Sequence, residues 1–343
     1  MSHNPEYEKM PQNLNAFHLS EKALADLGKV KWAVTEKVHG ANFSFVYENR
    51  KLLFAKRKEY LKWSDDFFGF QLVVKELEEK VIQLFEQLRS DIKAERYIIY
   101  GELFGGKYPH PKIEADEQVQ AIQTGVYYHP SVKFCAFDIA IESGNTKWYL
   151  DYKTAVSYFE RFNIFHARVL FSGKLNEALS YNIRINSTVP KQLGLPELNP
   201  NIIEGIVIKP LSHSELKGLE VRPVVKVKNP EFAEEKFHEA EKWSFVPDVK
   251  SHSEEFTFLV EEMTNYITYN RLESVLSKTG AIDFTNEKRM TEIKTEFLQD
   301  IFYDFNDNNN QILDSLTPSQ KEWVKNRLNV CINEFITDNS KTN

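Results

Sequence analysis

The strongest constraint on the fold is a change in the hydrophobic pattern near residue 245. Before it, β-branched and aromatic residues alternate with polar ones in short runs, namely 31–36, 42–47, 52–56, 97–102, 132–141, 205–209 and 224–228. After it, apolar residues recur every three or four positions in three segments, 254–278, 287–305 and 318–335. A period of two is typical of strands and the longer period of helices. We therefore predict an α+β domain built on an antiparallel sheet, residues 1–245, followed by a small all-helical domain, residues 246–343.

Local signals place some of the element ends. The turn Glu48–Lys51 is expected to join two strands into a hairpin. Apolar residues recur every three or four positions from Val73 to Leu88, which predicts one amphipathic helix packed on the sheet. Residues 237–253 are expected to form a connector. Asn306–Asn310 should end the second C-terminal helix, and Thr317 before Pro318 should start the third.

Charge is distributed unevenly along the chain. The net charge is −7, and the last 93 residues alone contain 9 Lys and Arg against 16 Asp and Glu. The first 250 residues are therefore balanced. An acidic chain can still bind phosphates where basic residues cluster, so their location matters more than the total.

The sequence also excludes several classes of protein. Its two cysteines, Cys135 and Cys331, lie too far apart to suggest a disulfide framework or a cysteine-based zinc site. No uncharged apolar run approaches the roughly 18 residues that a spanning helix needs. The first 20 residues resemble neither a secretory nor a mitochondrial targeting segment. We expect an intracellular protein, cytoplasmic by default, that does not associate with membranes.

The segment Lys37-Val38-His39-Gly40 lies between two predicted strands. A lysine followed closely by glycine stands where the backbone can turn tightly, so its amine can project into a cleft. Taken alone, the segment is more typical of a surface lysine before a turn.

A second segment, Glu204–Lys209, is an apolar strand with a carboxylate at its start and an ammonium at its end. Both charges are costly in a core unless they face a polar cleft. Glu204 and Lys209 differ in parity, so the strand must bend near Gly205 if both are to reach one site.

A third segment places Lys226 and Lys228 on one face of a strand, about 7 Å apart. Two neighbouring ammonium groups repel each other unless an anion lies between them, and a polyphosphate is the natural candidate. A solvated edge of a sheet is the alternative.

Together, in this order, the three segments resemble the covalent nucleotidyltransferase superfamily of ATP-dependent ligases and mRNA capping enzymes. The run Glu36–Ser44 is similar to the nick-sealing RNA ligase family of the RNA ligase 2 type, which includes the trypanosome RNA editing ligases. DNA ligases and capping enzymes usually have Asp where His39 stands. The resemblance implies an ATP-grasp-like nucleotidyltransferase fold for the first domain.

Further segments match the same family between about residues 30 and 285: Ala55–Arg57, Asp66–Gly69, Tyr100–Gly106, Gly105–Pro111, Ala136–Ile139, Tyr266–Leu272 and Val275–Gly280. One position departs from it. Some members have a basic residue where Thr35 stands, so a phosphate contact made there would have to come from elsewhere.

The resemblance implies that the Lys37 amine attacks the α-phosphorus of ATP and becomes lysyl-AMP. Only an unprotonated amine can attack, so we expect Lys226, Lys228 and bound Mg²⁺ (or Mn²⁺) to lower the pKa of Lys37 and hold the α-phosphate. Glu204 is the expected metal ligand. Lys209 is expected to contact phosphate or nucleotide.

The resemblance also implies how the nucleotide is bound. Glu36 should accept a hydrogen bond from the adenine amino group, and Phe137 should stack on the ring. Arg57 and Glu102 should hold the ribose.

Three further residues belong to the expected site. Asp138 should orient a basic partner or a water molecule. Asn42 and His39 are included by motif membership. His39 would serve pyrophosphate release or make a purely structural hydrogen bond.

AMP would then pass to a 5′-phosphate, and a 3′-hydroxyl would attack that phosphate and expel AMP. The implied substrate is an RNA with a 3′-OH/5′-phosphate nick, in a duplex, sealed by a monomer acting in RNA repair. Local contacts near the nick are expected from four C-terminal residues, Arg271, Lys278, Lys288 and Arg289.

Two alternatives share part of the pattern. A capping-type guanylyltransferase would use the same lysines but carry an OB-fold instead of helices, and it would label with GTP. A non-catalytic nucleic-acid-binding scaffold would use the lysines only to hold phosphates and would form no adduct with ATP.

Overall fold

The computed structural model describes residues 5–216, 219, 221–232 and 245–340. The chain divides into two compact units, Met1–Val249 and Lys250–Asn343, which are described separately below. Part of the predicted connector, residues 237–244, lies outside the described residues.

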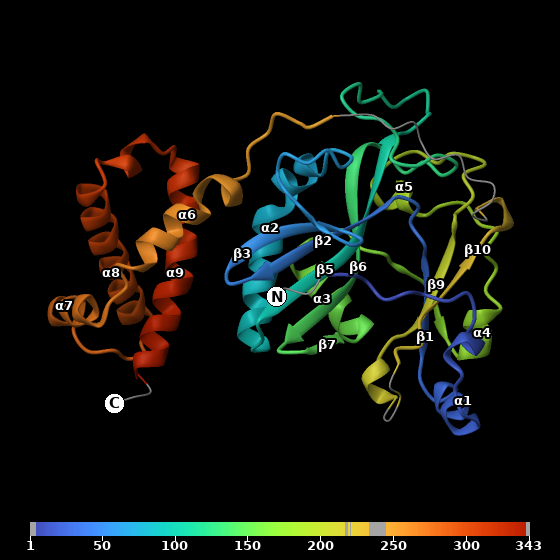
Figure 1. Ribbon diagram of the computed structural model, residues 1–343, viewed down its shortest axis with the longest axis horizontal. Helices are drawn as coiled ribbons and strands as arrows, with labels where there is room; N and C mark the ends of the chain where they lie inside the picture. The colour runs from blue at the N-terminus through green and yellow to red at the C-terminus, as the bar shows by residue number, and fades with distance from the viewer. Residues whose placement is uncertain (1–4, 217–218, 220, 233–244, 341–343) are drawn as a thin grey trace. The chain divides into compact units, whose positions relative to one another are not determined.

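The first unit contains two antiparallel sheets (Figure 1). The four-stranded sheet has the order β10-β9-β1-β8, formed by β1 (Trp32–Glu36), β8 (Val169–Gly173), β9 (Gly205–Pro210) and β10 (Val225–Lys228). The six-stranded sheet has the order β4-β3-β2-β5-β6-β7, formed by β2 (Ala41–Glu48), β3 (Lys51–Lys56), β4 (Tyr60–Leu61), β5 (Arg96–Lys107), β6 (His129–Ser143) and β7 (Thr146–Tyr149). The predicted α+β class with an antiparallel sheet is confirmed, and each predicted strand corresponds to an observed one.

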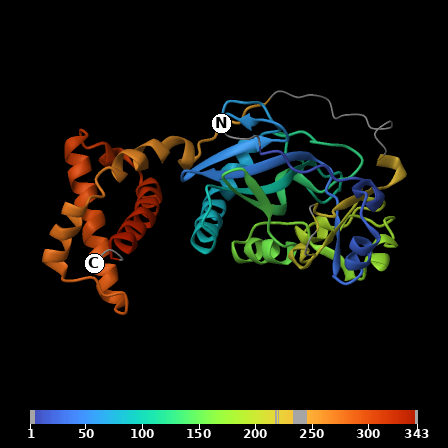
Figure 2. The same ribbon diagram turned by 60° about the horizontal axis from the view of Figure 1, so that its bottom comes forward.

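The helices of this unit are α1 (Glu21–Leu27), α2 (Phe70–Asp91), α3 (Tyr152–Arg161), α4 (Leu175–Leu179) and α5 (Val189–Gln192), with short 3₁₀ turns at Leu14–Phe17, His213–Glu215 and Pro230–Phe232. Helix α2 is the predicted amphipathic helix. It lies against one face of the six-stranded sheet (Figure 2), where Phe70 packs on Phe43 and Phe54 with ring centroids 5.7 Å apart in both pairs.

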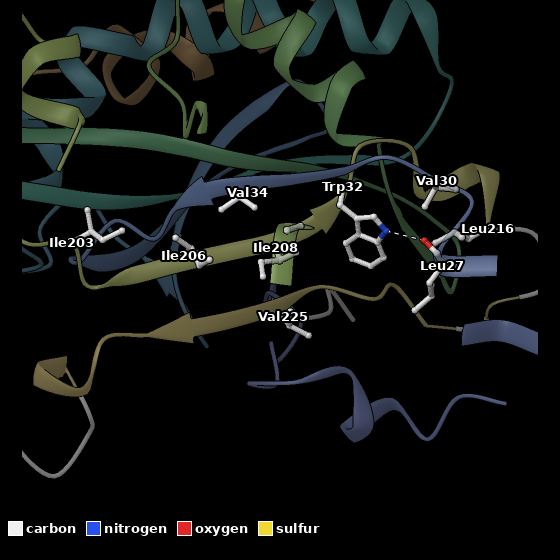
Figure 3. Close-up of a cluster of buried hydrophobic side chains, with 10 residues drawn as sticks. Leu27, Val30, Trp32, Val34, Ile203, Ile206, Ile208, Leu216 and Val225 are labelled. Atoms are coloured by element: carbon white, nitrogen blue, oxygen red, sulfur yellow. Dashed lines mark hydrogen bonds between the residues drawn. The ribbon is translucent and has the colours of Figure 1, made fainter. Parts of the chain in front are cut away.

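The four-stranded sheet buries one face in an apolar cluster that includes Trp32, Ile206, Ile208 and Val225 (Figure 3). The Trp32 indole donates a hydrogen bond to the Leu27 carbonyl at 2.9 Å, which satisfies the one polar atom of that side chain. Because side chains alternate along a strand, the residues between these apolar ones face the opposite side, where the candidate site lies.

The second unit consists of α6 (His252–Thr264), α7 (Tyr269–Thr279), α8 (Glu287–Asn308), a 3₁₀ turn (Ile312–Ser315) and α9 (Pro318–Ser340). The prediction of one helix over 254–278 is wrong. The chain leaves the helix at Asn265 and restarts where the Thr268 hydroxyl accepts a hydrogen bond from the Arg271 N–H at 3.3 Å. Such an N-cap fixes the start of a new helix, which apolar periodicity alone does not reveal.

The other two C-terminal helices agree better with the sequence. Helix α8 continues three residues into the asparagine run and ends at Asn308. The predicted start of α9 at Pro318 is confirmed, and Thr317 forms a capping box with Gln320, with N···O distances of 2.8 and 3.4 Å. No helix among the described residues is long and apolar enough to cross a membrane.

Candidate active site

A pocket lies between the two sheets of the first unit. Strands β1 and β9 contribute residues from one sheet, and β2, β5 and β6 contribute residues from the other. The lining side chains discussed below are Tyr7, Met10, Glu36, Lys37, Asn42, Glu102, Phe137 and Lys209. Many of the residues chosen from the sequence thus meet in one place, although they span more than 170 positions.

Lys37 follows the last residue of β1 and is fixed on both sides. Its N–H donates to the Gly205 carbonyl at 2.9 Å, which ties it to β9. On the other side the turn presses on β5, because a Cβ on Gly40 would lie 1.9 Å from the Leu103 carbonyl oxygen. Only glycine allows that approach. The His39 N–H donates to the Tyr128 hydroxyl at 2.9 Å and anchors the turn further.

The Glu204 carboxylate is the centre of the charged cluster. It is 1% exposed and lies 2.7 Å from Lys37 Nζ, 3.0 Å from Lys228 Nζ and 3.3 Å from His39 Nδ1. Burial alone would raise the pKa of Glu204, but the His39 hydrogen bond and the Lys37 charge lower it to about 2. Glu204 is therefore an anion. It precedes the first residue of β9, so strict alternation does not govern it, and Glu204 and Lys209 both reach the site.

The expected lowering of the Lys37 pKa is not found in the nucleotide-free protein. Burial does act to lower it, but the Glu204 and Glu102 charges outweigh burial and raise the pKa of Lys37. Lys228, expected to help lower it, pairs with the same carboxylate. Lys37 is thus held as an ammonium ion.

Glu102 and its neighbours occupy another side of the pocket. Asn42 on β2 lies directly opposite Glu102 on β5. Burial raises the pKa of Glu102 to about 7, against the opposing charges of Lys37 and Arg57. Arg57 follows β3 and is exposed, yet its charge is near enough to act on Glu102, as the expected ribose-binding pair requires.

Glu36 is buried and already oriented by a segment that the sequence did not single out. Its carboxylate accepts hydrogen bonds from the Ser187 hydroxyl at 2.6 Å, the Thr188 N–H at 3.0 Å and the Thr188 hydroxyl at 3.1 Å. Burial raises the pKa of Glu36. Oε1 accepts only the Ser187 bond and Oε2 accepts both Thr188 bonds. A carboxylate oxygen can accept about two hydrogen bonds, so Oε1 keeps capacity for a ligand.

Phe137 and Asp138 are adjacent, yet both take part in the site. The register between β5 and β6 shifts here, with Tyr100 opposite Asp138 and Gly101 opposite Ala136, so Phe137 is the extra residue of a bulge. Phe137 lines the pocket, and Asp138 contacts Lys209, which also lines it.

Lys209 does not point to open space in the pocket. Its ammonium donates to the Phe137 carbonyl at 2.7 Å and to Asp138 at 3.2 Å, and it lies 3.9 Å from the centre of the Tyr152 ring. Burial lowers the pKa of Lys209 to about 8, although Asp138 opposes that change. Asp138 has the expected basic partner, and also a second one, Arg222, that sequence reasoning missed.

Lys226 and Lys228 share the face of β10 opposite the apolar cluster, because Val225 and Val227 pack into that cluster. Lys228 reaches Glu204. The Lys226 N–H donates to the Pro11 carbonyl at 2.9 Å, which brings the N-terminal residues to this strand.

Two of the four basic residues expected near a nick are paired inside the second unit. Arg271 contacts Asp304 at 2.7 Å, and Lys278 contacts Glu296 and Asp300 at 2.9 and 3.3 Å. Lys288 is exposed near the start of α8, and Arg289 is half-buried beside it. Contacts of Arg271 or Lys278 with phosphate would have to compete with these ion pairs.

Comparison with known families assigns both units. Residues 30–228 match the RNA ligase family model, and residues 250–334 match the model of the T4 RNA ligase 2 C-terminal domain. The chain belongs to the RNA ligase family. The predicted RNA ligase 2 type and the enzyme class of ATP-dependent RNA ligases are thereby confirmed.

Individual proteins are similar to this chain. The mitochondrial RNA-editing ligase 2 of Trypanosoma brucei brucei is 28% identical over 321 residues, covering 80% of this chain and 76% of that protein. RNA-editing ligase 1 is 28% identical over 305 residues, and the chain spans 65% of its length. Among solved structures, a Naegleria gruberi RNA ligase variant with AMP and Mn is 17% identical with a TM-score of 0.41, covering 66% of this chain and 57% of that one.

Proposed function

We propose that this protein is an ATP-dependent ligase that seals 3′-OH/5′-phosphate nicks in duplex RNA through a lysyl-AMP intermediate. The observation that carries the proposal is the Lys37 amine, fixed between the two sheets and 2.7 Å from the buried Glu204 carboxylate, in a pocket lined by polar and aromatic groups. Phosphate binding alone needs no lysine fixed at one point by a buried carboxylate, whereas attack by an amine needs its nitrogen at a set position in the pocket.

In the first step, Lys37 Nζ attacks the α-phosphorus of ATP. The N–P bond forms, the bond from the α-phosphorus to the bridging oxygen breaks, and pyrophosphate leaves with the electron pair. Lys37 first gives up a proton, since the ammonium has no lone pair. Lys228 lies beside Glu204 and would hold the α-phosphate together with Lys226 on the same strand face.

The donor set fits a divalent cation. Glu204 is an ionised carboxylate. A second carboxyl group, Glu102, lies close enough for the Glu204 charge to raise its pKa. No cluster of three or more His, Cys, Asp or Glu side chains arranged for a metal occurs in the described part of the chain. Mg²⁺ suits such a sparse site, because it keeps several waters and uses one or two carboxylates plus substrate phosphates. Glu204 would hold the cation, whose positive charge beside Lys37 would favour the neutral form of the amine.

The remaining residues would bind the nucleotide. Phe137, the extra residue of the β6 bulge, would stack on adenine. Glu36 would accept a hydrogen bond from the adenine amino group through its remaining lone pairs. Arg57 and Glu102 would hold the ribose. Lys209 would contact phosphate or nucleotide from the side of the pocket, and Asp138 would balance its charge.

In the second step AMP passes to the 5′-phosphate of the RNA, and in the third the 3′-hydroxyl attacks that phosphate and releases AMP. We assign presentation of the RNA ends to the helical unit. Its net negative charge and its internal ion pairs favour a few local contacts over wide wrapping of the duplex.

The two alternatives lose their support. A capping-type enzyme would carry an OB-fold after the catalytic domain, whereas residues 250–334 match a ligase helical domain. A scaffold would not need the buried pair of Lys37 and Glu204.

A sealing assay tests the proposal. Nicked duplexes in which each strand flanking the nick is RNA or DNA are incubated with ATP and Mg²⁺, with a single-stranded RNA as comparison. We expect the nicked RNA duplex to be sealed fastest, and Lys37→Ala to seal none. Equal joining of single-stranded ends, or no joining of any substrate, would contradict the proposal.

A further inference from the structure

The N-terminal residues 6–11 are part of the nucleotide pocket. We call them the N-terminal segment. Tyr7 and Met10 line the pocket beside Phe137, and the Tyr7 ring packs edge-on against the Phe137 ring with centroids 5.0 Å apart. The segment has no helical or strand structure of its own, so its position depends on bonds to the rest of the unit.

Polar bonds hold this segment along its length. Lys147 Nζ donates to the Glu6 carbonyl at 2.8 Å, and the Lys226 N–H donates to the Pro11 carbonyl at 2.9 Å. The second bond has a simple cause. Strand β10 is an edge strand, and its outward N–H needs an acceptor that no neighbouring strand supplies.

Arg222 joins the N-terminal segment to Asp138, the neighbour of the pocket-lining residue Phe137. Its two Nη atoms each lie 3.0 Å from one oxygen of Asp138, and Nη2 also donates to the Tyr7 hydroxyl at 2.7 Å. Its Nε donates to Glu8 at 2.6 Å, and the guanidinium lies 3.8 Å from the centre of the Tyr149 ring. A planar, five-donor fork is required for this set of bonds, which lysine cannot reproduce.

Stability alone does not account for the arrangement. Asp138 is fully buried and Arg222 is 7% exposed, and a buried ion network is often no more stabilising than apolar side chains of the same volume. The effect of the network is geometric, because it sets Tyr7 against Phe137 and ties both to Arg222, three residues before the start of β10, the strand that carries Lys226 and Lys228.

We propose that Arg222 is a positioning residue for ATP: it locks the N-terminal segment as a wall of the base-binding side of the pocket. This rests on the proposed function, since it assumes that the pocket receives ATP. Arg222 touches no reacting atom, so its loss should weaken nucleotide binding more than it slows the chemical step.

The test measures the initial rate of lysyl-AMP formation against ATP concentration, with thermal unfolding of each variant. Arg222→Lys should raise the KM for ATP about tenfold and change kcat by less than about threefold. Tyr7→Phe removes only the hydroxyl and should raise KM in the same direction by a smaller factor, which decides the matter if Arg222→Lys does not fold.

Arg96→Lys is the matched control. Arg96 is equally buried and also bridges two carboxylates, Glu48 at 3.2 Å and Glu142 at 2.8 Å, but it lies about 20 Å along β5 from Glu102. It should lower the melting temperature and leave KM unchanged. Unchanged KM in both pocket variants, or an equal rise in Arg96→Lys, overturns the inference. If the wild-type protein forms no lysyl-AMP, the proposed function itself fails.

Discussion

The ion pair between Lys37 and Glu204 sets the protonation state of the candidate nucleophile. Burial favours the neutral amine, and the two carboxylates Glu204 and Glu102 favour the ammonium and prevail. Lys37 thus rests as an ammonium ion, and the proposed attack on ATP requires it to lose a proton.

The first prediction concerns this balance. In the absence of ATP and metal, Glu204→Gln should lower the pKa of Lys37, because it removes the larger of the two attracting charges and leaves burial in place. The midpoint for modification of Lys37 by an amine-reactive reagent, followed by mass spectrometry against pH, should move to lower pH. Glu231→Gln, which removes an exposed partner of Arg184, should leave it unchanged. A midpoint that stays or rises in Glu204→Gln would refute the account of this pair.

The second prediction concerns the hydroxyl that anchors the turn after Lys37. Tyr128→Phe leaves the His39 N–H without its 2.9 Å acceptor. An unsatisfied buried donor costs roughly 1–3 kcal/mol, which urea unfolding would register. Displacement of the turn should slow lysyl-AMP formation by about tenfold or more, since small misplacements are costly.

Tyr158→Phe is the control for that variant. It removes a hydroxyl bonded to Asp91 at 2.5 Å on the surface and should change neither quantity appreciably. If Tyr128→Phe reacts with ATP as fast as the wild type, the turn does not depend on this anchor.

At the scale of elements, the close approach of β9 and β10 brings Lys228 to Glu204. A Cβ on Gly205 would lie 2.1 Å from the Val227 carbonyl oxygen and 2.8 Å from Lys228 Cα. The glycine therefore permits the strand spacing on which the charged cluster depends.

The third prediction follows from that spacing. Gly205→Ala should separate the strands, lower the free energy of unfolding by roughly 1–3 kcal/mol and reduce lysyl-AMP formation more than the stability loss explains. Gly28→Ala is the control, because its nearest neighbour would be the Ala25 carbonyl oxygen at 3.4 Å. Equal effects of the two substitutions on lysyl-AMP formation would show that the strand spacing does not matter.

The sequence predicted the strands well because alternation is a local property. It could not predict the bulge at Phe137, since a register shift depends on the partner strand. It also missed Arg222 and Tyr7, which are single residues with no periodic pattern and meet only through the tertiary fold. The break between α6 and α7 was missed because one capping threonine ended the apolar period.

The sequence predicted which residues meet in the site better than it predicted their protonation states. Lys37, Glu204 and Lys228 meet as the motifs indicated. The raised pKa of Lys37 depends on which charges lie nearest, and the order of residues along the chain does not specify that.

For the whole molecule, the proposed reaction steps are divided between the two units. All the residues proposed for the first step belong to Met1–Val249. The last residues of that unit also pack on it, since the Trp63 indole donates to the Val249 carbonyl at 3.2 Å.

The fourth prediction is that a fragment ending at Val249 still forms lysyl-AMP but transfers AMP poorly to a nicked RNA duplex. The first step needs no other unit, whereas the later steps need a second substrate held in line. Adenylylation by the fragment and sealing by the pre-adenylylated fragment are the two measurements. Sealing as fast as the full chain would show that the helical unit does not position RNA, and a folded fragment that fails to adenylylate would contradict the pocket assignment.

The residue that carries AMP after reaction with ATP is the most direct test of the proposed lysyl-AMP mechanism. The full chain is incubated with ATP and Mg²⁺, digested, and examined by mass spectrometry for AMP on the peptide that contains Lys37. We expect AMP on Lys37 in the wild-type protein. We expect no adduct in Lys37→Ala or in Lys37→Arg, whose guanidinium stays protonated. No AMP on the wild-type protein, or the same AMP level in Lys37→Ala, would contradict it.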